Sequence, residues 1–153
     1  MPDLPEVGER WQEDGKSCTA PGGHRSGGYN ELWQFGEAVA PMLLKMVHLR
    51  ESLKPYVAEL AKNATAQGTP PMQPLFYQWP DDAKAWAVDD QYMFGASYLV
   101  APVLEMGARN RTVYFPGGAE TSWRHLFSGA LHKGGKAEIV MSPLDEIPVF
   151  TRV

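Results

Sequence analysis

Two adjacent carboxylates, Asp89 and Asp90, lie in the stretch AVDDQYMFGASYLVAPVL, just before an aromatic turn and an apolar run. Paired carboxylates cleave glycosidic bonds when they face each other across the sugar, roughly 5 to 9.5 Å apart. Adjacent side chains instead point to opposite faces of a strand, or lie about 100° apart around a helix. The spacing therefore argues against a catalytic pair, and it favours an aspartate N-cap for the turn that starts at Gln91. By the same reasoning Asp81 and Asp82, which follow Pro80, are predicted to be solvated turn residues.

His24 is the best isolated candidate for a substrate contact, because GGHRSGG surrounds it with glycines that let the backbone approach a ligand. A surface histidine in a flexible loop has the same pattern, so both interpretations stay open. His48, His125 and His132 have no Cys, Asp or Glu at metal-ligand spacing, and no serine lies in a GxSxG motif. The sequence therefore predicts neither a metal nor another cofactor.

A set of aromatic residues has two interpretations. They form a platform on which a sugar ring stacks, or they belong to the core, which is the commoner role of such residues. The set is Trp33, Phe35, Trp79, Trp86 and Tyr92.

Composition excludes several classes of protein. The chain has 153 residues, of which 44% are apolar and 21% charged, and this composition is typical of a globular protein. Its formal charge is −4, and its basic residues form no stripe of the kind that binds nucleic acid. No run of about 18 apolar residues predicts a membrane span. The single cysteine, Cys18, excludes an internal disulfide framework and favours a reduced, cytoplasmic location, although a large secreted protein can also lack disulfides.

The positioning elements change character along the chain. Residues 1–29 are rich in glycine and proline and predict a loop. From Asn30 apolar residues recur every three or four positions, which predicts a long amphipathic helical segment with breaks near Pro41 and Pro55 and a C-cap at Gly68.

The rest of the chain has β character. Leu75 to Trp79 has the composition of a strand, closed by a turn at Pro80. Beyond Tyr98, short β-like runs alternate with turns as in a β-sandwich. Along residues 136–141, the alternation of Ala137, Ile139 and Met141 with charged residues predicts a strand with one wet face. These runs are SYLVAPVL, RTVYFP, SWRHLF, KAEIVM and IPVFTRV.

Five blocks follow one another along the chain: SGGYNELWQFGE, LRESLKPYVAELA, GTPPMQPLFYQWPDD, DDQYMFG and YLVAPVL. In this order they resemble consecutive landmarks of the family 31 glycoside hydrolases, the α-glucosidases, α-xylosidases and their relatives. The resemblance continues through GARNRTVYFPGG, LFSGALHKGG and IPVF. It covers nearly everything from residue 26 onward. Gln73 stands where that family usually has arginine.

The resemblance implies an α/β part followed by an all-β part. Residues 1–29 would be a barrel loop, residues 30–95 the last part of a (β/α)₈ barrel with its last strand at Leu75 to Trp79, and residues 96–153 the start of an incomplete C-terminal β-sandwich. Asp89 to Gln91 would mark the junction and would not be the catalytic pair.

The resemblance also implies a function. Two aspartates on earlier barrel strands carry the family's chemistry, so this chain is expected to be a C-terminal fragment of a retaining α-glycosidase, without catalytic residues and inactive alone. The parent enzyme would take an oligosaccharide or an α-glycoside. The alternative is a non-catalytic β-rich module that binds carbohydrate or a partner. Unpaired strand edges and an uncovered helix face predict self-association.

Overall fold

The computed structural model describes residues 35–153, and the chain divides into two units between residues 46 and 47, inside helix α2 (Ala40–Ser52). The described part of the first unit, residues 35–46, holds the beginning of that helix. All strands of the described residues belong to the second unit, residues 47–153. None of the helices in the described range is long and apolar enough to cross a membrane.

The helical segment breaks where proline predicts it. Helix α2 ends at Ser52 and α3 (Lys54–Gln67) begins after Leu53, with Pro55 in its first turn, where a missing amide donor costs no helical hydrogen bond. Pro41 likewise lies in the first turn of α2. Gly68 ends α3 in the left-handed conformation, φ +68°, and its N–H donates to the Ala64 carbonyl at 3.0 Å. The break near Pro55 and the cap at Gly68 are confirmed, whereas the predicted start at Asn30 lies outside the described residues.

The strand predicted at Leu75 to Trp79 is wrong. Residues Leu75–Gln78 form the single-turn helix α4, closed by the Trp79 N–H donating to the Leu75 carbonyl at 3.1 Å. The preceding strand, β1 (Met72–Gln73), ends before this segment, and the N-cap Pro74 is still extended, with φ −63° and ψ 156°. Strand propensity of aromatic residues reflects packing on a sheet. Here Phe76 stacks on the indole ring of Trp86 and not on a sheet, so this contact outweighs the local preference for a strand.

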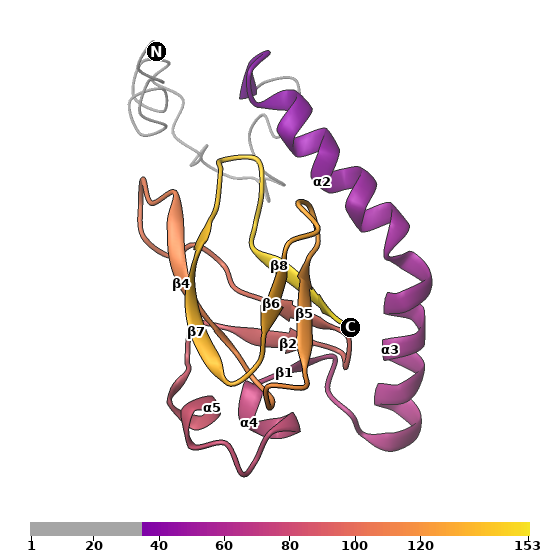
Figure 1. Cartoon of the computed structure of the whole chain (residues 1–153). Helices are drawn as coiled ribbons and strands as arrows, with labels where there is room; N and C mark the ends of the chain where they lie inside the picture. The colour runs from indigo at the N-terminus through magenta and orange to yellow at the C-terminus, as the bar shows by residue number, and fades with distance from the viewer. Residues whose placement is uncertain (1–34) are drawn as a thin grey trace, which may run out of the picture. The chain divides into compact units, whose positions relative to one another are not determined.

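Six antiparallel strands form the larger sheet, in the order β1-β2-β3-β8-β5-β6 (Figure 1). The bounds of the last five are β2 Tyr92–Phe94, β3 Tyr98–Val100, β8 Val149–Arg152, β5 Ser122–His125 and β6 Leu131–Lys133. Strands β2 and β6 are absent from the sequence prediction, which places a turn at Gln91 to Phe94 and no strand at residues 131–133.

Register aligns one buried row across five strands of this sheet. Gln73 pairs with Met93, Met93 with Leu99, Leu99 with Phe150, and Phe150 with His125. All five side chains are buried. Because residues in register share a face, the row defines the side of the sheet that carries the core.

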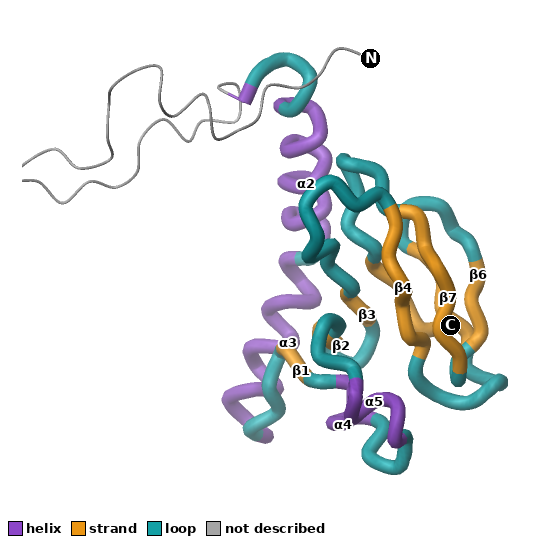
Figure 2. Tube along the Cα trace, turned by 90° about the vertical axis from the view of Figure 1, so that its left-hand side faces the viewer, coloured by secondary structure: helices purple, strands orange, loops and turns teal. Residues whose placement is uncertain are grey.

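The smaller sheet pairs β4 (Asn110–Phe115) with β7 (Lys136–Met141), which run side by side in Figure 2. On β7 the predicted choice of faces is wrong, because Ile139 and Met141 are exposed while Val140 is buried. Glu138 is only half-exposed, since His132 Nδ1 lies 2.6 Å from its carboxylate and Lys136 contacts it as well. Alternation predicts two faces but not which of them a partner sheet covers.

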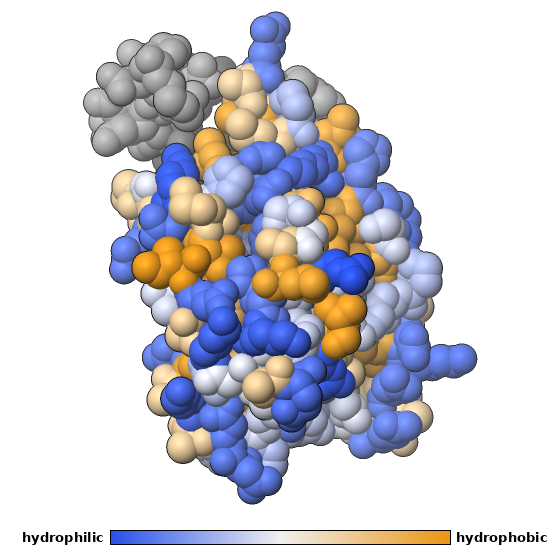
Figure 3. Space-filling view, viewed as in Figure 1, coloured by the Kyte–Doolittle hydropathy of each residue, from blue (hydrophilic) through white to orange (hydrophobic). Residues whose placement is uncertain are grey.

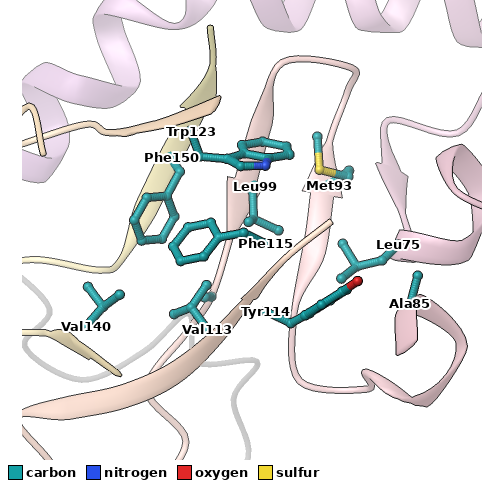
Figure 4. Packing of buried hydrophobic residues seen from close by; sticks show 11 residues of the cluster. Leu75, Ala85, Met93, Leu99, Val113, Tyr114, Phe115, Trp123, Val140 and Phe150 are labelled. Carbon is teal, nitrogen blue, oxygen red and sulfur yellow. The ribbon is translucent and has the colours of Figure 1, made fainter. Parts of the chain in front are cut away.

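Strands of both sheets supply the core (Figure 4). Phe115 meets Phe150 edge to face with ring centroids 4.8 Å apart. The indole N–H of Trp123 donates to the Pro116 carbonyl at 3.0 Å, which satisfies the one polar atom of a fully buried side chain. The core thus ties β5 and β8 of the large sheet to β4 of the small one.

Residues 35–153 are mostly β-sheet with some helices, which agrees in part with the predicted α/β part followed by an all-β part. The predicted boundary between residues 95 and 96 falls in the turn between β2 and β3, which pair in one sheet from Tyr92↔Val100 to Phe94↔Tyr98. The division into 1–29, 30–95 and 96–153 stays a prediction.

Candidate functional site

An open hollow of about 530 Å³ lies where α4 and α5 (Ala83–Ala87) meet the end of β4. Its volume is within the range typical of ligand sites, about 300–1,000 Å³. We call it the α4–β4 hollow, and its lining residues are Gln78, Trp79, Pro80, Asp81, Asp82, Lys84, Tyr114, Gly117, Gly118 and Gly135.

Asp82 organises one wall of this hollow. Its carboxylate caps α5 by accepting the Lys84 backbone N–H at 3.0 Å, and it also accepts a hydrogen bond from the Tyr114 hydroxyl. Asp82 is therefore a half-buried structural residue, and the prediction of a solvated turn holds only for Asp81, which is exposed. Pro80, two positions before Asp82, favours the turn that brings Asp82 to the N-terminus of α5.

The chemistry open to the hollow is binding. Burial, together with the hydrogen bond and negative charge of Asp82, raises the pKa of Tyr114 well above its ordinary value, so the phenol stays protonated and is no nucleophile. The Lys84 ammonium lies 5.9 Å from the centroid of that ring. Because the Asp82 carboxylate is already bound by two donors, it is not available as one member of a carboxylate pair that cleaves a glycoside.

Asp90, of the acidic pair at residues 89 and 90, is held by Arg111. Its carboxylate lies 2.6 Å from Arg111 Nη2, and its carbonyl accepts from Nη1 at 3.0 Å. The predicted N-cap is wrong, because residues Tyr92–Phe94 form a strand and no helix begins there. The neighbouring Gln91 is buried and exchanges two 2.8 Å hydrogen bonds with the backbone N–H and carbonyl of Tyr114. Together these contacts hold β4 against the end of the α5 segment.

His24 lies outside the described residues, so its role in substrate binding stays a prediction. His125 is buried, and its Nδ1 accepts the Ser128 N–H at 3.2 Å. That places the proton of the neutral ring on Nε2, which has no partner among the described residues. Burial lowers the pKa of His125. Within residues 35–153 no three His, Cys, Asp or Glu side chains gather as metal ligands.

The aromatic set separates in the structure. Trp79 is half-buried between the Trp123 ring, 5.9 Å away, and the Arg152 guanidinium, also 5.9 Å from its centroid. Trp86 is 59% exposed. Trp33 lies outside the described residues. Sequence reasoning missed Tyr114 as a partner of Asp82, because no local signal connects residues 32 positions apart.

Comparison with known proteins decides the family. A model of the glycosyl hydrolase family 31 C-terminal domain matches residues 68–153. The chain belongs to glycosyl hydrolase family 31. The match covers both sheets and the α4–β4 hollow, so these features are those of a family 31 C-terminal domain.

Other family 31 proteins agree over most of the chain. It is 30% identical over 149 residues to alpha-glucosidase 2 of Bacillus thermoamyloliquefaciens, covering 96% of this chain and 19% of that protein. It is 39% identical over 116 residues to the sulfoquinovosidase of Agrobacterium fabrum, covering 76% and 17%. A crystal structure of a family 31 alpha-xylosidase from a soil metagenome, complexed with xylose, superposes with a TM-score of 0.78 at 46% identity, covering 82% of this chain and 18% of that one. The chain therefore spans less than a fifth of each of these family 31 proteins.

Proposed function

We propose that this chain is the C-terminal part of a retaining α-glycosidase that hydrolyses an α-glucosidic or α-xylosidic bond in an oligosaccharide. The observation that carries the proposal is a match over 82–96% of the chain to proteins named alpha-glucosidase and alpha-xylosidase, of which it spans a fifth or less. In this proposal residues 30–95 contribute the last part of the (β/α)₈ barrel, and residues 96–153 begin the β-sandwich.

The arrangement of carboxylates supports a catalytic centre supplied by the rest of the enzyme. Retention needs one carboxylate that attacks the anomeric carbon and another, about 5 Å away, that protonates the leaving oxygen. Asp82 is bound by Tyr114 and the α5 N-terminus, and Asp90 is bound by Arg111. Both are therefore committed to structure, and neither is proposed to take part in the reaction.

An assay of the purified chain on aryl α-glucosides and α-xylosides tests this proposal. We expect no turnover by the chain, and the variants Asp82→Asn and Asp90→Asn should behave in the same way. Turnover that is abolished by one aspartate substitution in this chain would contradict the proposal. Sequencing the DNA upstream of the Met1 codon is a second test, because the proposal expects a frame that encodes earlier barrel strands.

A second function, non-catalytic carbohydrate binding, is favoured by the α4–β4 hollow and by the exposed indole of Trp86, whose N–H bonds the carbonyl of the lining residue Pro80. Calorimetry of the chain with malto- and xylogluco-oligosaccharides tests it. Saturable binding by the folded chain supports this function. It leaves open the assignment to the parent enzyme, since a domain of a glycosidase can itself hold sugar.

A further inference from the structure

We propose that Trp86 is the stacking platform of a subsite for one neutral pyranose ring, with polar groups of the α4–β4 hollow completing it. The proposal rests on the second function above, carbohydrate binding, and adds the residue and the chemistry that carry it.

The indole ring of Trp86 is exposed but fixed in orientation. One face stacks on Phe76 of α4, with centroids 4.3 Å apart and planes 9° from parallel. The indole N–H donates to the Pro80 carbonyl at 2.8 Å, so the single polar atom is satisfied within the protein. Because 59% of the residue remains exposed while Phe76 covers one face, the other face is open to solvent. An immobilised flat aromatic surface loses little conformational entropy when a ligand covers it.

The chemistry of that surface fits a sugar ring. The face of an indole carries negative charge density and is strongly apolar. The C–H groups of glucose or xylose gather on the faces of the pyranose ring and are slightly positive, while the hydroxyls point outward around its rim. Such a ligand covers the indole with its C–H face and leaves the hydroxyls to seek polar partners.

The hollow that supplies polar partners is connected to the platform through Pro80. Pro80 belongs both to the lining of the hollow and to the anchor of the Trp86 indole. The hollow also carries the exposed carboxylate of Asp81, an acceptor, and the ammonium of Lys84, a donor. A neutral polyol both donates and accepts hydrogen bonds, so it uses groups of both signs. A charged ligand would be repelled by one of these two groups, an anion by Asp81 and a cation by Lys84.

Calorimetry and NMR titration of the full chain with maltotriose test the subsite, with the acyclic polyol sorbitol as a control that has no ring face. For one ring on an open surface we expect a dissociation constant on the order of 1 mM. Trp86→Ala is expected to weaken binding at least about tenfold. Tyr77→Ala removes another exposed aromatic from α4, outside the Trp86–Phe76 stack, and is expected to leave the affinity unchanged.

Circular dichroism of each variant shows whether it is folded, and Trp86→Phe, which keeps a smaller ring, is expected to retain part of the affinity. Titration should also shift the indole N–H signal of Trp86 in the wild-type chain. Equal affinity of the wild type and a folded Trp86→Ala would overturn the subsite while carbohydrate binding stands. Equal affinity for sorbitol would also overturn it. No binding by the folded wild type would overturn both the subsite and the second function.

Discussion

The hydroxyl of Tyr56 in α3 donates a 2.9 Å hydrogen bond to the carbonyl of Phe94 in β2, and this contact joins a helix with no buried residue to the large sheet. The same hydroxyl accepts the Ser97 N–H at 3.3 Å. The Tyr56 ring also lies edge-on to those of Phe94 and Tyr98, with centroids 5.9 and 5.1 Å away. Tyr56 is therefore the main attachment of α3 to the β2–β3 hairpin.

Gly95 allows that approach. It has φ +61°, and a Cβ there would overlap the Tyr56 hydroxyl and lie 2.6 Å from Leu60 Cδ2. We predict that Gly95→Ala destabilises the contact between α3 and the hairpin by about 2–5 kcal/mol, from overpacking and left-handed strain together. Hydrogen exchange should show loss of protection in α3.

Gly68→Ala is the matched control, because Gly68 has φ +68° with nothing within 4 Å of the added Cβ. It should cost only about 1–2 kcal/mol of strain. Equal losses of α3 protection in both variants would mean that strain, not the clash with Tyr56, governs the effect.

The Tyr114–Asp82 hydrogen bond predicts alkaline sensitivity. The pKa of Tyr114 is raised in the folded chain, so its hydroxyl ionises more readily in the unfolded chain. Its contribution to stability is fully present below about pH 10, the ordinary tyrosine value, and is lost as pH rises above it. Urea unfolding between pH 8 and 11 measures this loss.

Tyr114→Phe should lower the free energy of unfolding at pH 8 by about 1.5–3 kcal/mol, the cost of a hydrogen bond to a charged acceptor. Its stability should then fall less steeply with alkaline pH than that of the wild type. Tyr77→Phe, at an exposed position, should behave as the wild type. Parallel pH curves for the wild type and Tyr114→Phe would contradict the prediction.

The burial of His125 leads us to predict that the folded chain loses stability in acid. Burial lowers its pKa, with Glu146 opposing and His132 reinforcing that shift. The neutral ring therefore contributes stability above about pH 6.5, and the contribution is lost as pH falls below that value, where the unfolded chain takes up the proton first. His125→Asn keeps an acceptor for the Ser128 N–H but does not titrate. Denaturant unfolding from pH 7.5 to 5 should show a smaller loss of stability in this variant, and an unchanged slope would refute the assignment to His125.

Exposed apolar side chains support the prediction of self-association. Ile139 and Met141 are 73% and 66% exposed on β7, and apolar residues reach the surface at several places on the face seen in Figure 3. Sedimentation velocity of the chain should show dimers or larger species that Ile139→Lys with Met141→Lys reduces. A monodisperse monomer with strong exchange protection across residues 39–60 would contradict it.

The sequence by itself determined the features that depend on neighbouring residues. The helix break before Pro55, the cap at Gly68 and five of the strand positions beyond Tyr98 follow from local backbone preferences, and they are observed. Family membership also follows from ordered motifs, because a motif is a local string that needs no geometry to be recognised.

The tertiary structure alone decided which distant residues meet. Asp82 binds Tyr114 and Asp90 binds Arg111 because packing in the shared core brings β4 to the α5 segment, and neither contact is visible in residue spacing. Leu75 to Gln78 became a helical turn, and β7 exposed its apolar face, because contacts outside each segment overruled its pattern. Local preferences amount to a few tenths of a kcal/mol per residue, whereas burial of one large side chain is worth about 1.5–3 kcal/mol, so packing determines the outcome where the two conflict.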